Sequence, residues 1–307
     1  MSAPLLPLPR PLRQGDRVRL VAASSALDSG DSLAAGLELL RSWGLVIEGD
    51  PQALLQRRWG YMAGRDRERL ADLTPAPVDS QEPPALLACV RGGWGAARLL
   101  EQRPPAEADW LLGFSDVTSL LFDRVVQGRG GGVHGPLLTT LAAEPAWSQE
   151  RLRALLFGEP LAPLQGESWR GGCAEGPLLA GNLTVATHLL GTPHLPPLAG
   201  AILVLEDVGE APYRIERMLT HWRLCGALQQ LAGLAFGSFR GCQEEDGDGR
   251  PPERCFSLEQ VLRERSLDLG IPVLAGLPVG HTPGNAALPL GVRARLDGDR
   301  GELALLP

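Results

Sequence analysis

The sequence predicts an α/β protein with parallel sheets, and three observations lead to that prediction. The chain of 307 residues is 44% hydrophobic and 21% charged, which is typical of a globular protein. Its first half alternates short apolar runs with amphipathic ones, the pattern of strands joined by helices. At about 150 residues per domain, its length favours two domains. We therefore expect a parallel sheet with helices on both faces, and ligands at the carboxyl ends of its strands.

The elements of the first half follow from the spacing of apolar residues. Leu33, Leu37 and Leu40 share one face of a helix expected over 32–43, which Gly44 ends. The same reasoning predicts further helices over 65–73, 92–100 and 116–126. Short apolar runs predict strands over 17–22, 45–48, 85–90 and 110–114. This order is that of a repeated strand and helix unit.

A proline- and glycine-rich segment over 156–175 divides the chain. It predicts an N-terminal α/β domain over 1–155, a linker over 156–175 and a C-terminal domain over 176–307. In the second domain we expect strands over 201–206, 231–239 and 273–277, helices over 184–190, 215–224 and 257–266, and a closing hairpin over 291–306.

The basic residues exclude several classes of enzyme. All 29 of them are arginine, and the sequence contains no lysine. Schiff-base enzymes, P-loop nucleotide-binding proteins, protein kinases and Ser-Lys dyads all need a lysine amine, so these classes are excluded. The net charge of −7 argues against a nucleic-acid partner, because binding to phosphates requires a basic face.

The spacing of cysteines and histidines predicts no metal site. The five cysteines are dispersed without a C-x-x-C pair, so we expect reduced thiols in a reducing compartment. An acidic segment over 244–248 lacks the closing Glu of a calcium loop and is interpreted as a solvated turn. Apolar runs are far shorter than the roughly 18 residues that span a bilayer, and prolines interrupt the N-terminal one. We therefore expect a cytoplasmic protein without a membrane partner or a metal site.

A serine follows the fourth expected strand abruptly. In Gly113-Phe114-Ser115-Asp116 a buried strand ends and a helix begins, which exposes the Ser115 hydroxyl beside the unpaired amides of the first helical turn. This resembles a nucleophile elbow, although the second glycine of G-x-S-x-G is missing. The alternative is that Ser115 only caps the helix, with Asp116 in its first turn.

Glycines follow the third expected strand in Arg91-Gly-Gly-Trp-Gly95. This turn has three interpretations: an oxyanion donor at Gly93, a tight turn needed for packing, or a phosphate-binding turn. It is not a dinucleotide fingerprint, because its last required glycine is missing. This absence weakens the hypothesis of an NAD-dependent oxidoreductase.

The second half supplies a candidate acid and a candidate base. Glu206 follows five apolar residues, and an ionised carboxylate there needs water or a polar partner. Asp207 and Glu216 are alternatives, but the strand end fixes the direction of Glu206. His281 lies among turn residues in a loop expected over 277–285.

Together these residues form a candidate set for nucleophilic catalysis. His281 would take the Ser115 proton, and Glu206 would hold the imidazole in the required tautomer. The N–H groups of Gly93 and Asp116 would stabilise the oxyanion, each contributing about 3 to 4 kcal/mol to lowering the barrier. The set functions only if three distant segments meet.

A series of motifs occurs along nearly the whole chain. In order, they are Val21-Ala-Ala-Ser-Ser-Ala26, Tyr61-Met-Ala-Gly64, Arg91-Gly-Gly-Trp-Gly95, Gly113-Phe-Ser-Asp116, His134-Gly-Pro136, Gly181-Asn-Leu183, Leu205-Glu-Asp207, Tyr213-Arg-Ile-Glu-Arg217, and Gly280-His281 through Asn285 to Leu288-Pro-Leu-Gly291. Together they resemble the LD-carboxypeptidases, also called murein tetrapeptide carboxypeptidases, and the related microcin C immunity peptidases. Trp94 stands where the family pattern has Tyr, and Ala180 where it commonly has Gly, which leaves substrate preference open.

The resemblance implies a Ser115, Glu206 and His281 triad with an oxyanion hole at the N–H groups of Gly93 and Asp116. It implies a flavodoxin-like or Rossmann-like N-terminal domain and a C-terminal α/β domain with a barrel-like or swivelling sheet. The site would lie between the domains of a homodimer that uses no cofactor. The implied substrate is a cytoplasmic muropeptide, in which the bond between diaminopimelate and the terminal D-alanine is hydrolysed during cell-wall recycling.

Two other functions stay open. One is a microcin-C-type immunity peptidase that cleaves a peptidyl or aminoacyl nucleotide amide. The other is a non-catalytic protein that binds muropeptides in the same cleft. Assays on both substrate classes, together with covalent labelling of Ser115, discriminate among the three.

Overall fold

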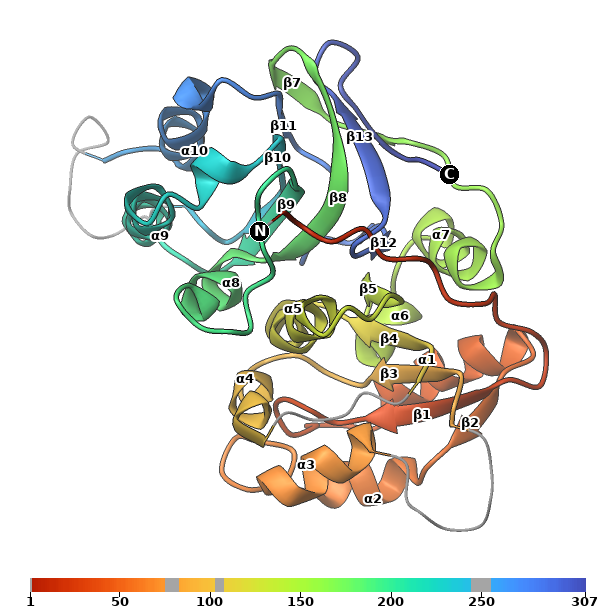
Figure 1. The fold of residues 1–307 in the computed structure, drawn as a ribbon. Coiled ribbons are helices and arrows are strands. Elements are labelled where there is room, and N and C mark those ends of the chain that lie inside the picture. Colours follow the sequence, from red (N-terminus) through yellow and green to blue (C-terminus); the bar gives the residue numbers. More distant parts are fainter. Residues whose placement is uncertain (1, 75–82, 103–107, 244–254) are drawn as a thin grey trace. The chain divides into compact units, whose positions relative to one another are not determined.

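The computed structural model describes residues 2–74, 83–102, 108–243 and 255–307, and these residues form two compact units (Figure 1). The N-terminal unit comprises Leu6–Leu161 and Pro283–Leu290. The C-terminal unit comprises Ala162–Thr282, Gly291–Pro307 and a short N-terminal segment that ends at Leu5. The chain therefore returns to the N-terminal unit late in the sequence, which the division at 156–175 does not anticipate.

The N-terminal unit is built on a six-stranded sheet. Its strands lie in the order β12-β5-β4-β3-β1-β2, and every pairing among β1 to β5 is parallel. The bounds are β1 Arg17–Val21, β2 Val46–Glu48, β3 Leu86–Cys89, β4 Trp110–Gly113, β5 Gly132–His134 and β12 Leu288–Pro289. β1 continues to β2 on one side, and the later strands follow on the other. The strand order therefore reverses between β1 and β3, which is where ligands bind in such sheets.

The helices of this unit are α1 Asp31–Ser42, α2 Pro51–Gln56, α3 Asp66–Leu73, α4 Ala96–Leu99, α5 Thr118–Val126, α6 Leu138–Leu141 and α7 Ala146–Phe157. α1 approaches α6 so closely at Gly36 that a Cβ there would lie only 2.0 Å from the carbonyl oxygen of Leu138. The expected helix over 92–100 begins only after Gly95, because Gly93 and Gly95 have positive φ.

The sequence pattern did not predict α7, and its buried polar residues explain why. Ser148 and Arg151 are buried in α7 and donate to the carbonyl oxygens of Asn285 and Ala287. These bonds hold the returning segment that leads into β12. Polar side chains on the buried face break the apolar period by which a helix is recognised.

The C-terminal unit is built on an eight-stranded sheet in the order β6-β14-β13-β8-β9-β10-β11-β7. The bounds are β6 Leu164–Gln165, β7 Glu167–Arg170, β8 Cys173–Asn182, β9 Ile202–Val208, β10 Gly233–Arg240, β11 Val273–Ala275, β13 Arg293–Asp297 and β14 Glu302–Leu305. The pairings from β8 to β11 are parallel, and the others are antiparallel. β6 and β7 lie at opposite edges yet are separated only by Gly166, so the sheet curls into a nearly closed barrel.

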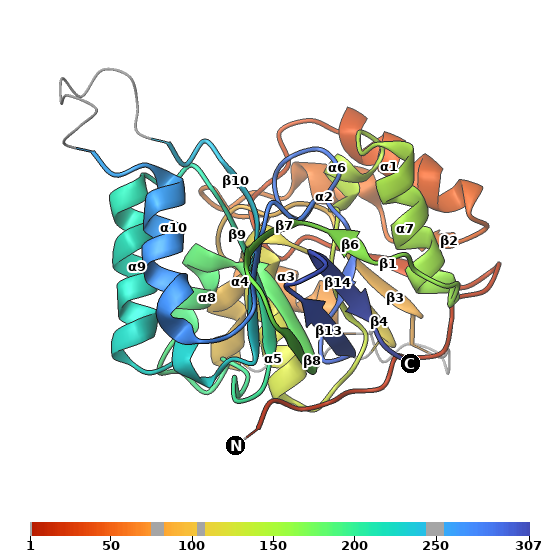
Figure 2. The ribbon, with the colours of Figure 1, turned by 90° about the horizontal axis from the view of Figure 1, so that it is seen from above.

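Three helices complete this unit: α8 Leu183–Leu189, α9 Pro212–Leu224 and α10 Leu258–Ser266. α9 packs against both α8 and α10, and Figure 2 shows α9 and α10 side by side. The expected linker over 156–175 contains the end of α7 and the strands β6 and β7, and the two units divide within it, between Leu161 and Ala162. These two strands are short and mostly exposed, so a search for apolar runs does not find them.

The other predicted helices and strands are confirmed to within a few residues, and the closing hairpin is β13 with β14. The predicted α/β fold class is confirmed. The acidic segment over 244–248 lies outside the described residues. Within the described ranges, no helix is both long and apolar enough to cross a bilayer.

Candidate active site

Ser115 lies in a strained turn at the carboxyl end of β4. The strand ends at Gly113, and Ser115 opens a 3-10 turn, Ser115–Val117, that leads directly into α5. Its φ is +62°, and it is the only residue other than glycine with positive φ in the described part of the chain. A side chain is held in that region only where the surrounding structure enforces it, and such strain concentrates at functional sites.

Gly113 permits the sharp turn before Ser115. A Cβ at this position would lie 2.7 Å from Cγ1 of Val117, closer than real Cβ contacts allow. Only Phe114 therefore separates the end of β4 from the 3-10 turn that leads into α5. This geometry is that of a nucleophile elbow, with Val117 packing where the second glycine of the usual motif would stand.

A glycine loop lies against Ser115 within the same unit. A Cβ on Gly92 would lie 3.1 Å from the Ser115 hydroxyl oxygen, which is a tight contact that a glycine avoids. Gly93 has φ of +111°, and a Cβ on it would lie 2.1 Å from the hydroxyl oxygen of Ser25. Ser25 fixes the loop at both ends: its own N–H donates to the Gly92 carbonyl at 3.2 Å, and its hydroxyl accepts from the Trp94 N–H at 3.1 Å.

The side chain of Asp116 ties the elbow to this loop. Its buried carboxylate accepts a hydrogen bond from the N–H of Ala96 at 2.8 Å, at the start of α4. Burial raises the pKa of Asp116, and the hydrogen bond from Ala96 opposes that shift. The backbone N–H groups of Gly93 and Asp116 therefore belong to two segments that one carboxylate holds together.

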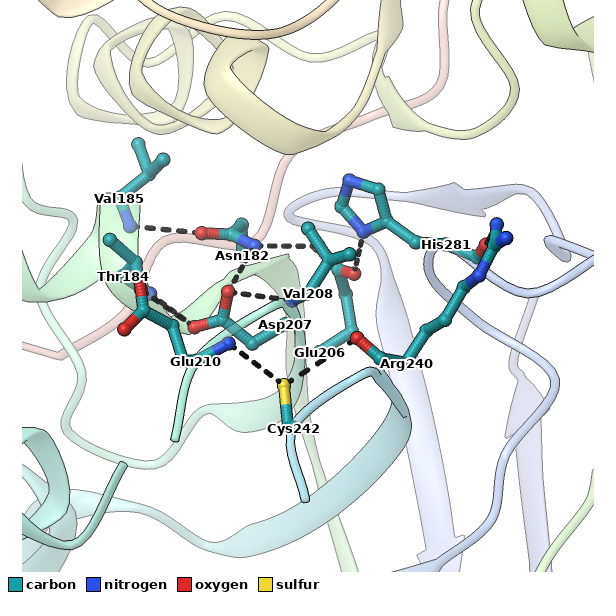
Figure 3. Close-up of polar contacts among 10 residues, drawn as sticks. All are labelled: Asn182, Thr184, Val185, Glu206, Asp207, Val208, Glu210, Arg240, Cys242 and His281. Atoms are coloured by element: carbon teal, nitrogen blue, oxygen red, sulfur yellow. Dashed lines mark hydrogen bonds and ion pairs between the residues drawn. The ribbon is translucent and has the colours of Figure 1, made fainter. Parts of the chain in front are cut away.

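In the C-terminal unit, His281 and Glu206 form a short hydrogen bond. Nδ1 of His281 lies 2.6 Å from Oε2 of Glu206, whose side chain is fully buried at the end of the apolar part of β9 (Figure 3). Gly280 has φ of +120°, and a Cβ there would lie 2.7 Å from that same carboxylate oxygen. A glycine before His281 therefore lets the loop approach the acid. Because an ionised carboxylate only accepts, Nδ1 is the donor in this bond, and in a neutral imidazole Nε2 is then the nitrogen that can accept a proton.

Asn182 bridges Glu206 to a second acid. The last residue of β8, Asn182 pairs in register with Glu206, and its Nδ2 donates to Oε1 of Glu206 at 3.2 Å and to Oδ1 of Asp207 at 3.0 Å. Its Oδ1 accepts from the N–H of Val185 and caps α8. The cap fixes which way the amide faces, so the NH₂ group must point at the two carboxylates (Figure 3).

Asp207, an alternative acid in the sequence, has a structural role here. It is buried and accepts hydrogen bonds from the N–H and hydroxyl of Thr184 and from the N–H of Val208. Burial raises the pKa of Asp207, and the neighbouring Glu206 charge adds to the rise. Glu216, the other alternative, accepts from Thr220 within α9. Of the three acids, Glu206 contacts the histidine.

The structure groups the candidate residues in two sets. Ser115, Gly93 and Asp116 lie together in the N-terminal unit, and Glu206 is hydrogen-bonded to His281 in the C-terminal unit. Asn182 lies in the Gly181-Asn-Leu183 motif, for which no role was predicted. A polar residue between an apolar strand and a helix is a capping signal, which would have identified it as an anchor. Among the residues that the structure describes, no three His, Cys, Asp or Glu side chains gather as a metal site.

Known proteins and family models match both halves of the chain. The family model of the LD-carboxypeptidase N-terminal domain matches residues 18–135, and that of the LD-carboxypeptidase C-terminal domain matches residues 175–296. A carboxypeptidase-named protein of Synechocystis sp. is 48% identical over 97% of each chain. The murein tetrapeptide carboxypeptidase of Pseudomonas aeruginosa is 35% identical over 92% of this chain and 94% of its own.

Solved structures share the fold. The muramoyltetrapeptide carboxypeptidase from Oxalobacter formigenes matches with a TM-score of 0.80 at 26% identity, over 94% of this chain and 97% of that one. A structure of the microcin C7 self-immunity protein MccF matches with a TM-score of 0.81 at 21% identity, over 98% of both chains. At that identity the likeness shows the fold alone.

Proposed function

The chain belongs to the LD-carboxypeptidase family and is a serine peptidase, and from that premise we propose that it releases the terminal D-alanine from murein tetrapeptides through Ser115, His281 and Glu206. The observation that carries the proposal is the hydrogen bond of 2.6 Å between Nδ1 of His281 and Oε2 of Glu206. It holds the imidazole in the tautomer that a general base requires.

In the proposed mechanism, Nε2 of His281 takes the proton from the Ser115 hydroxyl as its oxygen attacks the carbonyl before D-alanine. The N–H groups of Gly93 and Asp116 stabilise the oxyanion. His281 then donates the proton to the leaving amine, and D-alanine departs from an acyl-enzyme. Water attacks this ester with His281 again as base, which restores Ser115. The buried Glu206 carboxylate stabilises the imidazolium in both steps.

Replacing triad members tests this mechanism. Ser115→Ala and His281→Ala are each expected to lower turnover of the tetrapeptide by about 10⁴-fold or more, and the double variant by little more than either one, because triad residues act as a unit. Losses that multiply in the double variant would show that Ser115 and His281 act independently. Circular dichroism and thermal melting check that each variant stays folded.

Substrate class is tested with wild-type protein. We expect release of D-alanine from the tetrapeptide, measured by mass spectrometry, and slower cleavage of a peptidyl-adenylate of the kind that a microcin immunity peptidase processes. Faster cleavage of the adenylate would assign the immunity function instead. Binding without turnover, together with failure of a fluorophosphonate to label Ser115, would identify a non-catalytic muropeptide-binding protein.

We also propose a cytoplasmic homodimer, following the family resemblance. Light scattering of the purified protein tests the oligomeric state, and fractionation of the producing cells tests the location. A monomer at micromolar concentration would contradict the proposed homodimer.

A further inference from the structure

A carboxypeptidase has to recognise a free carboxylate close to the bond that it cuts. In the proposed reaction, the leaving D-alanine carries that carboxylate one residue past the scissile amide, and one residue spans at most about 3.6 Å. The group that binds it must therefore lie near His281, which protonates the leaving nitrogen. With no lysine in the chain, the cationic reader of this carboxylate is an arginine.

Arg240 lies where this role requires, at the carboxyl ends of the parallel strands of the C-terminal sheet. It is the last residue of β10, and it pairs with Val208 at the end of β9. β8, β9 and β10 are parallel, so Asn182, Glu206 and Arg240 all lie at the carboxyl ends of neighbouring strands. Ligands of parallel sheets bind at that edge.

The guanidinium of Arg240 contacts the histidine itself. Its Nη1 donates to the backbone carbonyl oxygen of His281 at 3.3 Å, and the side chain is otherwise exposed. Figure 3 shows it beside the His281 backbone. A carbonyl oxygen orients the guanidinium but does not neutralise it. The positive charge and most of its five N–H donors stay available for an anion.

Arg240 is distinguished from the other arginines of this unit by its partners. In the described part of the C-terminal unit, the arginines without a carboxylate partner are Arg170, Arg217, Arg240 and Arg295. Of these four, only Arg240 bonds to a residue of the proposed triad. The remaining arginines are held by Glu or Asp side chains.

We propose that Arg240 binds the terminal carboxylate of the substrate and thereby confers the carboxypeptidase specificity. This inference rests on the proposed function. A guanidinium binds a carboxylate through two parallel N–H bonds, which neither a peptide amide nor an extended chain can reproduce. Arg240 would therefore reject peptides whose terminal carboxylate is amidated or continued by another residue.

The test compares the tetrapeptide with a free carboxylate and the same peptide as its C-terminal amide. Wild-type protein is expected to prefer the acid, and Arg240→Gln is expected to lower kcat/KM for the acid by about 10- to 100-fold, the equivalent of one bond to a charged group. The amide should be cut equally by both proteins. Arg170→Gln is the matched control. Arg170, on the edge strand β7, also donates to a backbone carbonyl, that of Leu267, but not to a residue of the proposed triad.

The outcomes separate this inference from the proposed function. If Arg240→Gln lowers activity on acid and amide alike, Arg240 only supports the His281 loop and the inference is wrong. If wild-type protein cuts neither peptide, the proposed function fails. Calorimetry on Ser115→Ala then decides the inference alone: preference for the acid that disappears in Ser115→Ala with Arg240→Gln upholds it, and equal binding of acid and amide overturns it.

Discussion

Replacing Asn182 tests how the C-terminal unit holds two adjacent buried acids. Asn182 donates to Glu206 at 3.2 Å and to Asp207 at 3.0 Å, and its oxygen caps α8 through the N–H of Val185 at 3.1 Å. Loss of the cap costs about 1 kcal/mol, and loss of each bond to a charged acceptor about 1.5 to 3 kcal/mol. Because such losses are not additive, we expect Asn182→Ala to lower the free energy of unfolding by about 3 to 5 kcal/mol.

Asn182→Asp separates the two roles of this side chain. Aspartate caps helices well, so the cap is kept, but both donors are lost and a third carboxylate lies beside Glu206 and Asp207. Repulsion from its neighbours raises the pKa of the new carboxyl group above its value in the unfolded chain and adds to the raised pKa of Asp207. The extra cost of Asn182→Asp is therefore absent below pH about 4 and grows as the pH rises toward the raised pKa.

Urea denaturation from pH 4 to pH 8 measures this cost. At neutral pH, Asn182→Asp is expected to be at least as destabilised as Asn182→Ala, although it keeps the cap. Ser257→Ala is the matched control, because the Ser257 hydroxyl caps α10 of the same unit by accepting from the N–H of Gln260 and is hydrogen-bonded to no buried acid among the described residues. It should cost about 1 kcal/mol at every pH. A deficit of Asn182→Asp that is as small as this control and independent of pH would refute the reasoning.

Three further predictions concern the N-terminal unit. Ser115→Gly is expected to raise the melting temperature while abolishing turnover, because glycine adopts φ of +62° without strain; a lower melting temperature would contradict this. Gly93→Ala should lower the free energy of unfolding in urea by more than about 2 kcal/mol, since its Cβ would lie 2.1 Å from the Ser25 hydroxyl oxygen. The control is Gly191→Ala in the C-terminal unit, where φ is +79° and the space is open; it should cost about 1 kcal/mol. Burial raises the pKa of Asp116, so its contribution to stability falls as the pH rises from the unfolded to the folded pKa. Asp116→Asn should remove that part of the pH dependence in melting experiments, and an unchanged dependence would show that Asp116 does not titrate there.

Local signals in the sequence were sufficient for most elements and for the candidate residues. The spacing of Leu33, Leu37 and Leu40 defined α1, and the abrupt change from an apolar strand to Ser115 identified the elbow. Both signals lie within a few residues of the feature that they predict, and periodicity is a local property of the chain. Where buried polar residues interrupted the period, as Ser148 and Arg151 do in α7, the prediction failed.

Only the tertiary structure decided which distant residues meet. The register of β8 against β9 places Asn182 opposite Glu206, and the loop after β11 brings His281 to the same carboxylate. No spacing along the chain encodes these contacts, because they depend on how strands pair across the sheet. The partner of Arg240 is decided in the same way, which is why one arginine among 29 could be chosen from the structure and not from the sequence.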